Sequence, residues 1–499
     1  MAYKRLPYGH SLALFTDLYE LTMGQVFWAE GMAEWESVFH HFDRTNPLGG
    51  GYTVACGLEL IVDYLANLKF DEEDIAYLAS IPGNDNKPLF KPDYLRYLRQ
   101  IRFNCDLDAV GEGTVIFPHE PLVRVKGPLL VAQLVETALL TLGNYSTAIA
   151  TEAARICWAA GGAPVYDFSA RRAPGFDGSF TATRSAYIGG FAGTSNVWAA
   201  RHLGIPARNL KGTMAHSLVM SFDSELESFR AYARSLPNNC VFLVDTYGTI
   251  EGVKHAIQVG EDLRRGGLEM AGVRLDSGDF AKLSKQTRRL LDDAGFTKAA
   301  IMASNDLNEF LIQSLRTQDA AIGIWGVGTR LMVPSLAGVY KLAAIRKPGG
   351  DWVPKIKLSD QRIKTSIQGI LQTRRFRSPR HPRARNIADC IYDERTGLAE
   401  DSTMISLADQ TKERRLPSGA EPYDLLVPVM RQGKLVCELP NLEEIRAHRE
   451  VELEHVADGI RRFDNPDEFF VGLEKSLFIE REEMIRELRG VSEWEQEVN

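Results

Sequence analysis

Short apolar runs alternate with longer amphipathic stretches through the middle of the chain. The runs are residues 165–169, 212–216, 240–248, 272–279, 301–306 and 322–329. Each run ends in polar or glycine residues, and the stretch after it has apolar positions at helical spacing. Buried parallel strands are nearly continuous apolar runs, and strands that alternate with helices form parallel βα units. The pattern predicts an α/β barrel with polar residues at the carboxyl ends of its strands; a doubly wound open sheet is the alternative.

The two flanking parts of the chain have different patterns. Before the alternating region we expect helices at 11–30 and 57–68, strands at 36–43 and within 111–127, and one or two buried helices within 129–160. After it we expect strands at 351–358 and 387–393, a solvated arginine-rich loop at 374–385 and charged helices from 440 onward. The expected domains are an N-terminal α/β domain (1–130), a catalytic barrel (131–345) and a C-terminal strand and helix region (346–499) that packs back on the N-terminal domain.

Composition narrows the class of protein. The net charge of −8 provides no overall positive field for nucleic acid or an anionic membrane. The six cysteines are scattered, with no zinc-like spacing, which is typical of reduced thiols in the cytoplasm. Residues 1–10 lack the apolar core of a signal peptide, and apolar runs such as 128–135 are too short to span a bilayer. We expect a cytoplasmic protein that binds neither nucleic acid nor membrane.

The first predicted strand tip combines an aromatic ring with guanidinium groups. Phe168 offers a face for a flat heterocycle, and Arg171 can hold a carboxylate or phosphate. The alternative is that Phe168 belongs to the core and Arg171 to the surface. Ser195 lies in a Gly-Thr-Ser-Asn turn before a predicted helix, where such residues serve as N-caps or bind an anion through free amides.

The next tips carry a histidine and two carboxylates. His216 could act as a base or as a nucleophile toward a phosphoryl group, or be a structural hydrogen bonder. Asp245 and Asp276 end successive strands, where carboxylates bind sugar hydroxyls or magnesium. Arg274 points to the same side as Asp276, so the two form either an internal ion pair or part of a ligand site.

The last two regular runs end in small residues. Ser304, Gly328 and Thr329 lie where α/β barrels frequently bind phosphate, because glycine lets backbone amides approach it and a hydroxyl adds a donor. The spacing of a P-loop is absent.

These tips belong to ordered motifs that resemble the nicotinate phosphoribosyltransferase family over roughly residues 10 to 345. The motifs are ALFTDLYELTMGQ (13–25), GEGTVIFPHEPLVRVKGPLLVAQLVE (111–136), DFSARRAPGFDGSFTATRSAYIGGFAGTSNV (167–197), GTMAHSLVMSF (212–222), VFLVDTYGTIEG (241–252), VRLDSGDF (273–280), SNDLNE (304–309) and GVGTRL (326–331). The resemblance implies the irregular α/β barrel of type II phosphoribosyltransferases with an N-terminal α/β domain, here followed by a C-terminal extension, and a homodimer with shared active sites.

The resemblance also implies a reaction. The family transfers 5-phosphoribosyl from phosphoribosyl pyrophosphate to nicotinate, giving nicotinate mononucleotide and pyrophosphate for NAD salvage, with Mg²⁺ and with ATP as co-substrate. A nicotinamide phosphoribosyltransferase is the nearest alternative. A phosphosugar-binding barrel without turnover is the alternative of a different class.

Individual roles follow from the matching motifs. By resemblance, nicotinate stacks between Phe168 and Tyr19 of the partner's first helix, and ATP phosphorylates His216. Arg171, Thr213 and Arg274 match groups that hold nicotinate and adjacent phosphates; Asp245 and Asp276 lie near ribose and metal; and Ser304, Gly328 and Thr329 match the phosphate turns. Ser195 stands where nicotinamide-using relatives carry an aspartate, and since a serine can donate to a carboxylate, it favours nicotinate. One departure is the missing proline of a Lys- and Pro-Gly-containing segment near residue 364, which leaves pyrophosphate and ATP contacts there unassigned.

Overall fold

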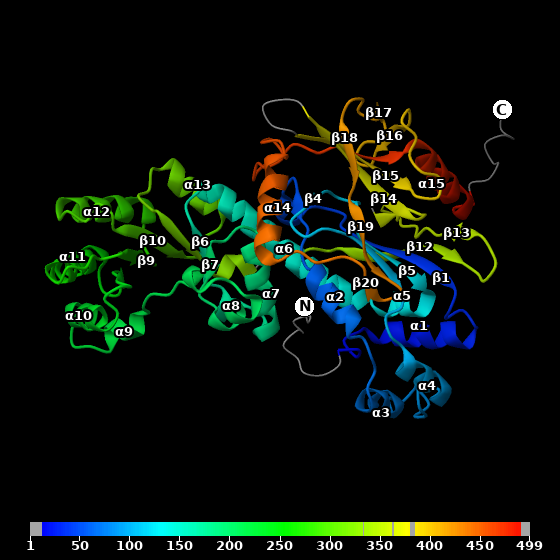
Figure 1. Cartoon of the computed structure of the whole chain (residues 1–499), viewed down its shortest axis with the longest axis horizontal. Helices are drawn as coiled ribbons and strands as arrows, with labels where there is room; N and C mark the ends of the chain where they lie inside the picture. The colour runs from blue at the N-terminus through cyan, green and yellow to red at the C-terminus, as the bar shows by residue number, and fades with distance from the viewer. Residues whose placement is uncertain (1–11, 333, 362–363, 380–384, 491–499) are drawn as a thin grey trace. The chain divides into compact units, whose positions relative to one another are not determined.

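The computed structural model describes residues 12–332, 334–361, 364–379 and 385–490 (Figure 1). The chain forms two compact units, one of residues 1–148 together with 335–499 and one of residues 149–334. The C-terminal region thus shares a unit with the N-terminal region. The predicted domain boundaries at 130 and 345 stay predictions, and the predicted absence of a signal peptide concerns residues outside the described part.

The second unit is built on a six-stranded parallel sheet. Its strands are β6 (Val165–Asp167), β7 (Gly193–Thr194), β8 (Val241–Leu243), β9 (Gly272–Leu275), β10 (Ala300–Asn305) and β11 (Ile324–Val327), in the order β7-β6-β11-β10-β9-β8. The helices are α7 (Gly175–Ile188), α8 (Val197–Leu203), α9 (His216–Met220), α10 (Glu225–Ser235), α11 (Thr249–Arg265), α12 (Phe280–Asp293) and α13 (Glu309–Thr317), several of which flank the strands in Figure 1. Because β7 and β8 do not pair with each other among the described residues, the α/β barrel is irregular, as predicted.

The strands form where the sequence is apolar on both faces. Phe242, Val273 and Ile301 are almost fully buried on adjacent strands. Parallel strands covered on both sides require such side chains, and the first polar residues follow where cover ends. The polar residues therefore gather at the carboxyl ends of β8, β9, β10 and β11.

One predicted strand is absent. Residues 212–216 form no strand, and His216 instead begins the short helix α9. Of this run only the side chain of Met214 is buried, so the segment is not covered on both faces as an inner strand is. The neighbouring position beside β6 is occupied by β7, which carries Thr194.

The first unit contains two larger sheets. One has the order β13-β12-β1-β5-β3-β19-β20 and the other β17-β16-β21-β15-β14-β18. The strands are β1 (Glu36–Phe42), β2 (Thr53–Val54), β3 (Asp106–Val110), β4 (Val115–Ile116), β5 (Pro121–Pro128), β12 (Val339–Arg346), β13 (Trp352–Pro354), β14 (Leu371–Ser378), β15 (Arg385–Asp393), β16 (Thr403–Ser406), β17 (Glu413–Arg415), β18 (Glu421–Asp424), β19 (Leu426–Arg431), β20 (Lys434–Leu435) and β21 (Val471–Glu474). N-terminal and C-terminal strands pair directly, β1 with β12 and β3 with β19.

Helices cover these sheets. They are α1 (Leu18–Ala29), α2 (Leu58–Ala66), α3 (Glu72–Ser80), α4 (Pro92–Gln100), α5 (Leu129–Leu134), α14 (Leu442–Glu454) and α15 (Lys475–Leu488), and α6 (Glu136–Ala160) runs across the division between the units. No helix in the described ranges is long and apolar enough to cross a membrane. All six cysteines are free thiols.

The arginine-rich segment is not the solvated loop that its composition predicts. Residues 374–378 belong to β14, while 380–384 lie outside the described residues. Arg375 is fully buried, and its guanidinium lies 2.6 Å from Asp389 and 3.3 Å from Glu452. For residues 374–378 the expectation was wrong, because the carboxylates that neutralise Arg375 come from other segments of the sequence.

Candidate active site

A cavity of about 390 Å³ opens at the carboxyl ends of the parallel strands in the second unit. Its lining brings together most of the residues predicted from the strand tips, namely Phe168, Arg171, Ser195, Thr213, Arg274, Asp276, Ser304, Gly328 and Thr329. All of them come from one unit of the chain. A volume of this size suits a small ligand with few polar anchors.

His216 and Asp245 do not line this cavity, but both lie next to Asp276, which does. The Nε2 atom of His216 lies 3.8 Å from Oδ2 of Asp276, and its Nδ1 atom lies 3.0 Å from the hydroxyl of Thr246. The other oxygen of Asp276 accepts a hydrogen bond from Ser304. Asp276 therefore links the histidine of α9 to Ser304, a predicted phosphate residue at the carboxyl end of β10.

Asp245 supports the loop that carries Asp276. Its Oδ2 accepts hydrogen bonds from the backbone N–H of Asp276 at 3.0 Å and from the hydroxyl of Ser277 at 2.5 Å. Its Oδ1 is buried and has no hydrogen-bond partner among the described residues. A buried carboxylate oxygen without a partner is costly, so Asp245 is suited to a cationic ligand.

Arg274 is aimed at the cavity rather than locked in an internal pair. Its Nη1 donates to the hydroxyl of Thr213, and Nε is buried without a partner. No ion pair with Asp276 forms within the described ranges, so the salt-bridge interpretation of this pair is wrong. Burial lowers the pKa of Arg274, while Asp276 and Asp245 act to raise it. The guanidinium is thus partly desolvated and available to an anion.

Neighbouring residues fix both the backbone and the ring of Phe168. Its backbone N–H donates to the carbonyl of Val327 at 2.8 Å, and its ring lies against Gly326. A Cβ atom on Gly326 would come within 2.6 Å of the ring. Because the ring also borders the cavity, Phe168 is a wall of the site rather than a core residue.

The neighbouring polar groups complete this wall. Arg171 is exposed and lines the cavity. Ser195 donates its hydroxyl and its backbone N–H to the carbonyl of Asp167, at 3.2 and 2.9 Å. The predicted N-cap at this turn is Asn196, whose side chain accepts from the N–H of Ala199. To donate to a ligand carboxylate, the Ser195 proton would have to turn away from Asp167.

Two features here were not predicted from the sequence. Asp167 is a buried carboxylate behind the cavity wall, recognisable only as a polar residue at the end of a strand. Asn305 lines the cavity with a φ of 108°. Such a backbone angle is strained for a residue other than glycine, and strain of this kind clusters at ligand sites.

Tyr19 belongs to the other unit. It lies on α1 with 46% of its surface exposed, which rules out a place in the core. Partial burial and then Glu136 raise the pKa of Tyr19 to about 12, so the phenol is neutral near pH 7. Tyr19 does not line the cavity formed by the second unit, and its predicted role in a shared site stays a prediction.

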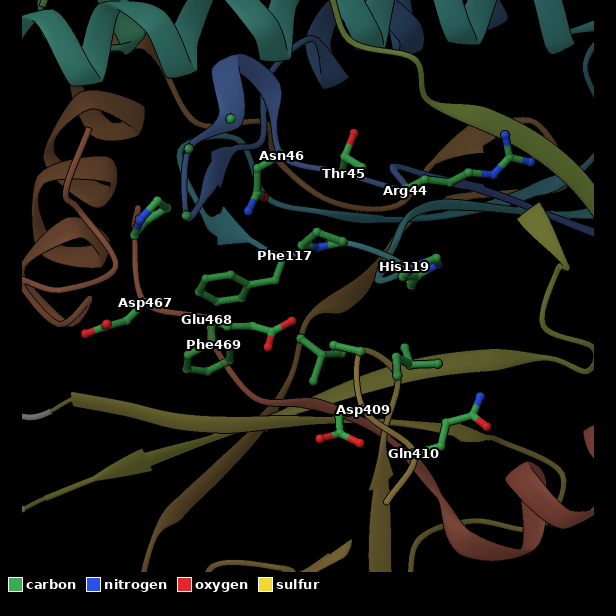
Figure 2. Close-up of a pocket in the computed structure, with 18 of the residues that line it drawn as sticks. Arg44, Thr45, Asn46, Phe117, His119, Asp409, Gln410, Asp467, Glu468 and Phe469 are labelled. Atoms are coloured by element: carbon green, nitrogen blue, oxygen red, sulfur yellow. The ribbon is translucent and has the colours of Figure 1, made fainter. Parts of the chain in front are cut away.

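The first unit contains a larger cavity of about 710 Å³ (Figure 2). Phe117 stacks on Phe469 in its wall at a centroid distance of 3.9 Å. Two of its three carboxylates are paired, because Asp409 lies 3.3 Å from Lys412 and Asp467 pairs with Arg462. None of the predicted strand-tip residues lines this cavity; those that line a cavity are at the smaller one.

Asp276 in the cavity lining and Asp245 beside it are compatible with magnesium held jointly with a ligand. Within the described ranges no three histidine, cysteine or acidic side chains cluster as a protein-only metal site. Asp245 and Asp276 offer two carboxylates, and one oxygen of Asp245 lacks a partner. Mg²⁺ commonly binds one or two carboxylates together with substrate phosphates, so this donor set fits it.

Comparison with known proteins identifies the family. Residues 14–144 match the nicotinate phosphoribosyltransferase (NAPRTase) N-terminal domain, residues 164–334 the NAPRTase family and residues 374–479 the NAPRTase C-terminal domain. The nicotinate phosphoribosyltransferase of Bacillus subtilis is 37% identical over 99% of both chains. The chain belongs to the nicotinate phosphoribosyltransferase family. This is an enzyme family of NAD salvage, and the resemblance seen in the motifs is confirmed.

Other members agree with this placement. Nicotinate phosphoribosyltransferase pncB2 of Mycobacterium tuberculosis is 45% identical over 67% of this chain and 71% of its own. The crystal structure of human nicotinic acid phosphoribosyltransferase superposes with a TM-score of 0.81 at 28% identity, covering 94% of this chain and 99% of that one. The NAPRTase fold therefore extends over both units, including the C-terminal region that the motifs did not reach.

Proposed function

We propose that this family member transfers the 5-phosphoribosyl group from phosphoribosyl pyrophosphate to nicotinate. The bond from C1 of ribose to the ring nitrogen forms, the bond from C1 to the pyrophosphate oxygen breaks, and pyrophosphate leaves. The observation that carries the proposal is the meeting of Phe168 and Arg171 with Asp276, Arg274 and Ser304 in one cavity. A ring-binding wall then shares one cavity with groups suited to a phosphosugar.

The base binds against Phe168. A pyridine ring can stack on the exposed face of Phe168, and Arg171 provides positive charge for the carboxylate. The absence of an acidic residue at position 195 removes a repulsion that nicotinate would otherwise meet. These features favour nicotinate over nicotinamide.

The phosphosugar binds next to the base in the same cavity. Gly328 and Thr329 offer backbone amides and a hydroxyl for the 5-phosphate, and Arg274 is free to contact phosphate oxygens. Positive charge develops on the ribose as pyrophosphate departs, and the carboxylate of Asp276 stabilises it. Asp245 and Asp276 would hold Mg²⁺, which when bound neutralises pyrophosphate charge.

ATP is coupled through His216. In the neutral tautomer that donates its Nδ1 proton to Thr246, His216 can attack the γ-phosphoryl group of ATP through Nε2. The N–P bond forms, the bond to the ADP oxygen breaks, and water later releases phosphate from the histidine. Charge added beside Asp276 changes the affinities for substrate and product by different amounts, which is how hydrolysis biases the transfer.

The enzyme works as a homodimer in the cytoplasm. Helix α1 exposes an apolar row at helical spacing: Leu18, Tyr19 and Val26 are each about half exposed, and Phe15 precedes them. An exposed row of this kind is suited to a second subunit, whose site Tyr19 would complete. The free thiols of all six cysteines agree with a reducing compartment.

The test is release of pyrophosphate from phosphoribosyl pyrophosphate that depends on nicotinate, with Asp276→Asn as the inactive comparison. Binding of the phosphosugar without release would instead support a non-catalytic barrel.

A further inference from the structure

We propose that Asp167 is the positioning residue that sets the geometry, and thereby the selectivity, of the base-binding wall. The inference rests on the proposed function of this cavity. Asp167 ends β6 and is 1% exposed, so it touches no ligand itself. It lies directly behind Phe168, which we assign to the base, and its carbonyl holds Ser195, which lines the same cavity.

The carboxylate of Asp167 is fully used by neutral donors. Oδ1 accepts from the backbone N–H of Ser169 at 2.8 Å and from its hydroxyl at 2.5 Å. Oδ2 accepts from the hydroxyls of Thr183 at 2.8 Å and Thr194 at 2.7 Å. These four bonds occupy about the full accepting capacity of an ionised carboxylate.

No basic side chain forms an ion pair with Asp167 in the described part of the chain. Burial of a carboxylate without a cation is expensive, and an apolar residue would fill the same space more cheaply. The charge is therefore not explained by packing. What it provides is direction, since each of four donors from three segments must point at one group.

The main chain of Asp167 holds the other side of the wall. Its carbonyl accepts both the N–H and the hydroxyl of Ser195. Phe168 follows it in sequence and is fixed by Val327 through its own N–H. A rotation at Asp167 thus moves the aromatic face and the Ser195 hydroxyl together.

A second layer of hydrogen bonds extends this control to α8. The hydroxyl of Thr194 accepts from the backbone N–H of Asn196 at 2.9 Å. The hydroxyl of Thr183 accepts from the side-chain amide of Asn196 at 3.3 Å. Each threonine can accept in this way because its own proton is given to Asp167. The carboxylate therefore sets the direction of both hydroxyls and, through them, the start of α8 at Asn196.

Asp167→Asn tests this role with little change in volume. One oxygen becomes an NH₂ group, which cannot accept from the two donors that it faces, either those of Ser169 or those of Thr183 and Thr194, so these must turn elsewhere. We expect the KM for nicotinate to rise about tenfold, as for loss of a charge-assisted hydrogen bond, while the KM for phosphoribosyl pyrophosphate changes less than about twofold. Thr194→Val, which keeps the charge and removes one donor, should give a smaller change in the same direction.

Controls separate positioning from stability. Glu225→Gln alters another buried carboxylate of the same unit, which accepts from His255 at 2.8 Å and does not line the cavity. It should leave the nicotinate KM unchanged even where thermal unfolding shows equal destabilisation. In a Ser195→Ala background, the effect of Asp167→Asn on the nicotinate KM should shrink, because both residues act on the same base-binding wall.

The wild-type enzyme must first show nicotinate-dependent turnover; if it does not, the proposed function fails before Asp167 is tested. Given wild-type turnover, equal rises in both KM values, an equal effect of Glu225→Gln, or full additivity with Ser195→Ala would each overturn the positioning role. If Asp167→Asn does not fold, Thr194→Val provides the test: its KM for nicotinate should rise more than its KM for phosphoribosyl pyrophosphate.

Discussion

The Nε2 atom of His216 lies 3.8 Å from the carboxylate of Asp276, while its Nδ1 atom lies 3.0 Å from the hydroxyl of Thr246. The hydroxyl fixes the ring, and the carboxylate connects it to Ser304. His216→Ala should therefore abolish ATP hydrolysis and ATP stimulation but keep a slow transfer that needs no ATP. His202→Ala, an exposed histidine of α8, should change neither activity.

The intermediate can be detected directly. Wild-type enzyme incubated with γ-labelled ATP should carry acid-labile, base-stable label. Undiminished labelling of a folded His216→Ala variant would show that another residue is phosphorylated.

Gly326 determines where the Phe168 ring lies. In Gly326→Ala the new Cβ would come within 2.6 Å of the ring and 3.4 Å of Ser304, so the ring must shift. We expect the KM for nicotinate to rise about tenfold and stability to fall by about 1–3 kcal/mol, as for overpacking. Gly323→Ala, with open space around its Cβ, is the matched control. An unchanged nicotinate KM in Gly326→Ala would mean that the base does not contact this ring.

Shared active sites predict complementation between subunits. Tyr19→Ala and Asp276→Asn should each be inactive alone, because one lacks the stacking group and the other the carboxylate. In mixed dimers one of the two sites keeps both groups, so part of the activity should return. No recovery in verified mixed dimers would place each site within one chain.

Asp43 makes stability depend on pH. It is 3% exposed, both its oxygens lack partners among the described residues, and burial raises its pKa from 3.8 to about 7. A raised folded pKa favours the protonated form, so the stability contribution is complete below about pH 4 and is lost as pH rises toward 7. Asp43→Asn removes this loss.

The unfolding midpoints of wild type and Asp43→Asn should therefore diverge in favour of the variant between pH 4 and 7, and then stay apart at a constant difference. A difference that does not change with pH would show that Asp43 titrates normally in the folded protein.

The strands could be predicted where all residues of a short segment are apolar and buried. Phe242, Val273 and Ile301 lie in continuous apolar segments. Asp276 and Ser304, at the ends of the last two, line one cavity as expected, whereas Asp245, after the first, does not line it and instead accepts from the backbone N–H of Asp276. The predicted strand at 212–216 was wrong. Its small residues do not indicate from sequence alone whether a strand there would be covered on both faces. His216 does not line the cavity but still lies 3.8 Å from Asp276, since α9 begins where the expected strand would have ended.

Long-range partners explain the other differences. Arg375 was expected to be solvated because Asp389, Glu120 and Glu452 are far from it in sequence. Asp167 went unnoticed for the same reason, as Thr183 and Thr194 lie on later elements. Periodicity reports which face of an element is covered, but it does not report which polar groups meet there.

The most direct measurement of the central claim is pyrophosphate release from phosphoribosyl pyrophosphate by the purified wild-type enzyme with Mg²⁺, with nicotinate, with nicotinamide or with no base, and with and without ATP. The account predicts release that requires a base, is much faster with nicotinate than with nicotinamide, is stimulated by ATP and is lost in Asp276→Asn. Release that is independent of base, equal turnover of nicotinamide, or binding of phosphoribosyl pyrophosphate without release would contradict it.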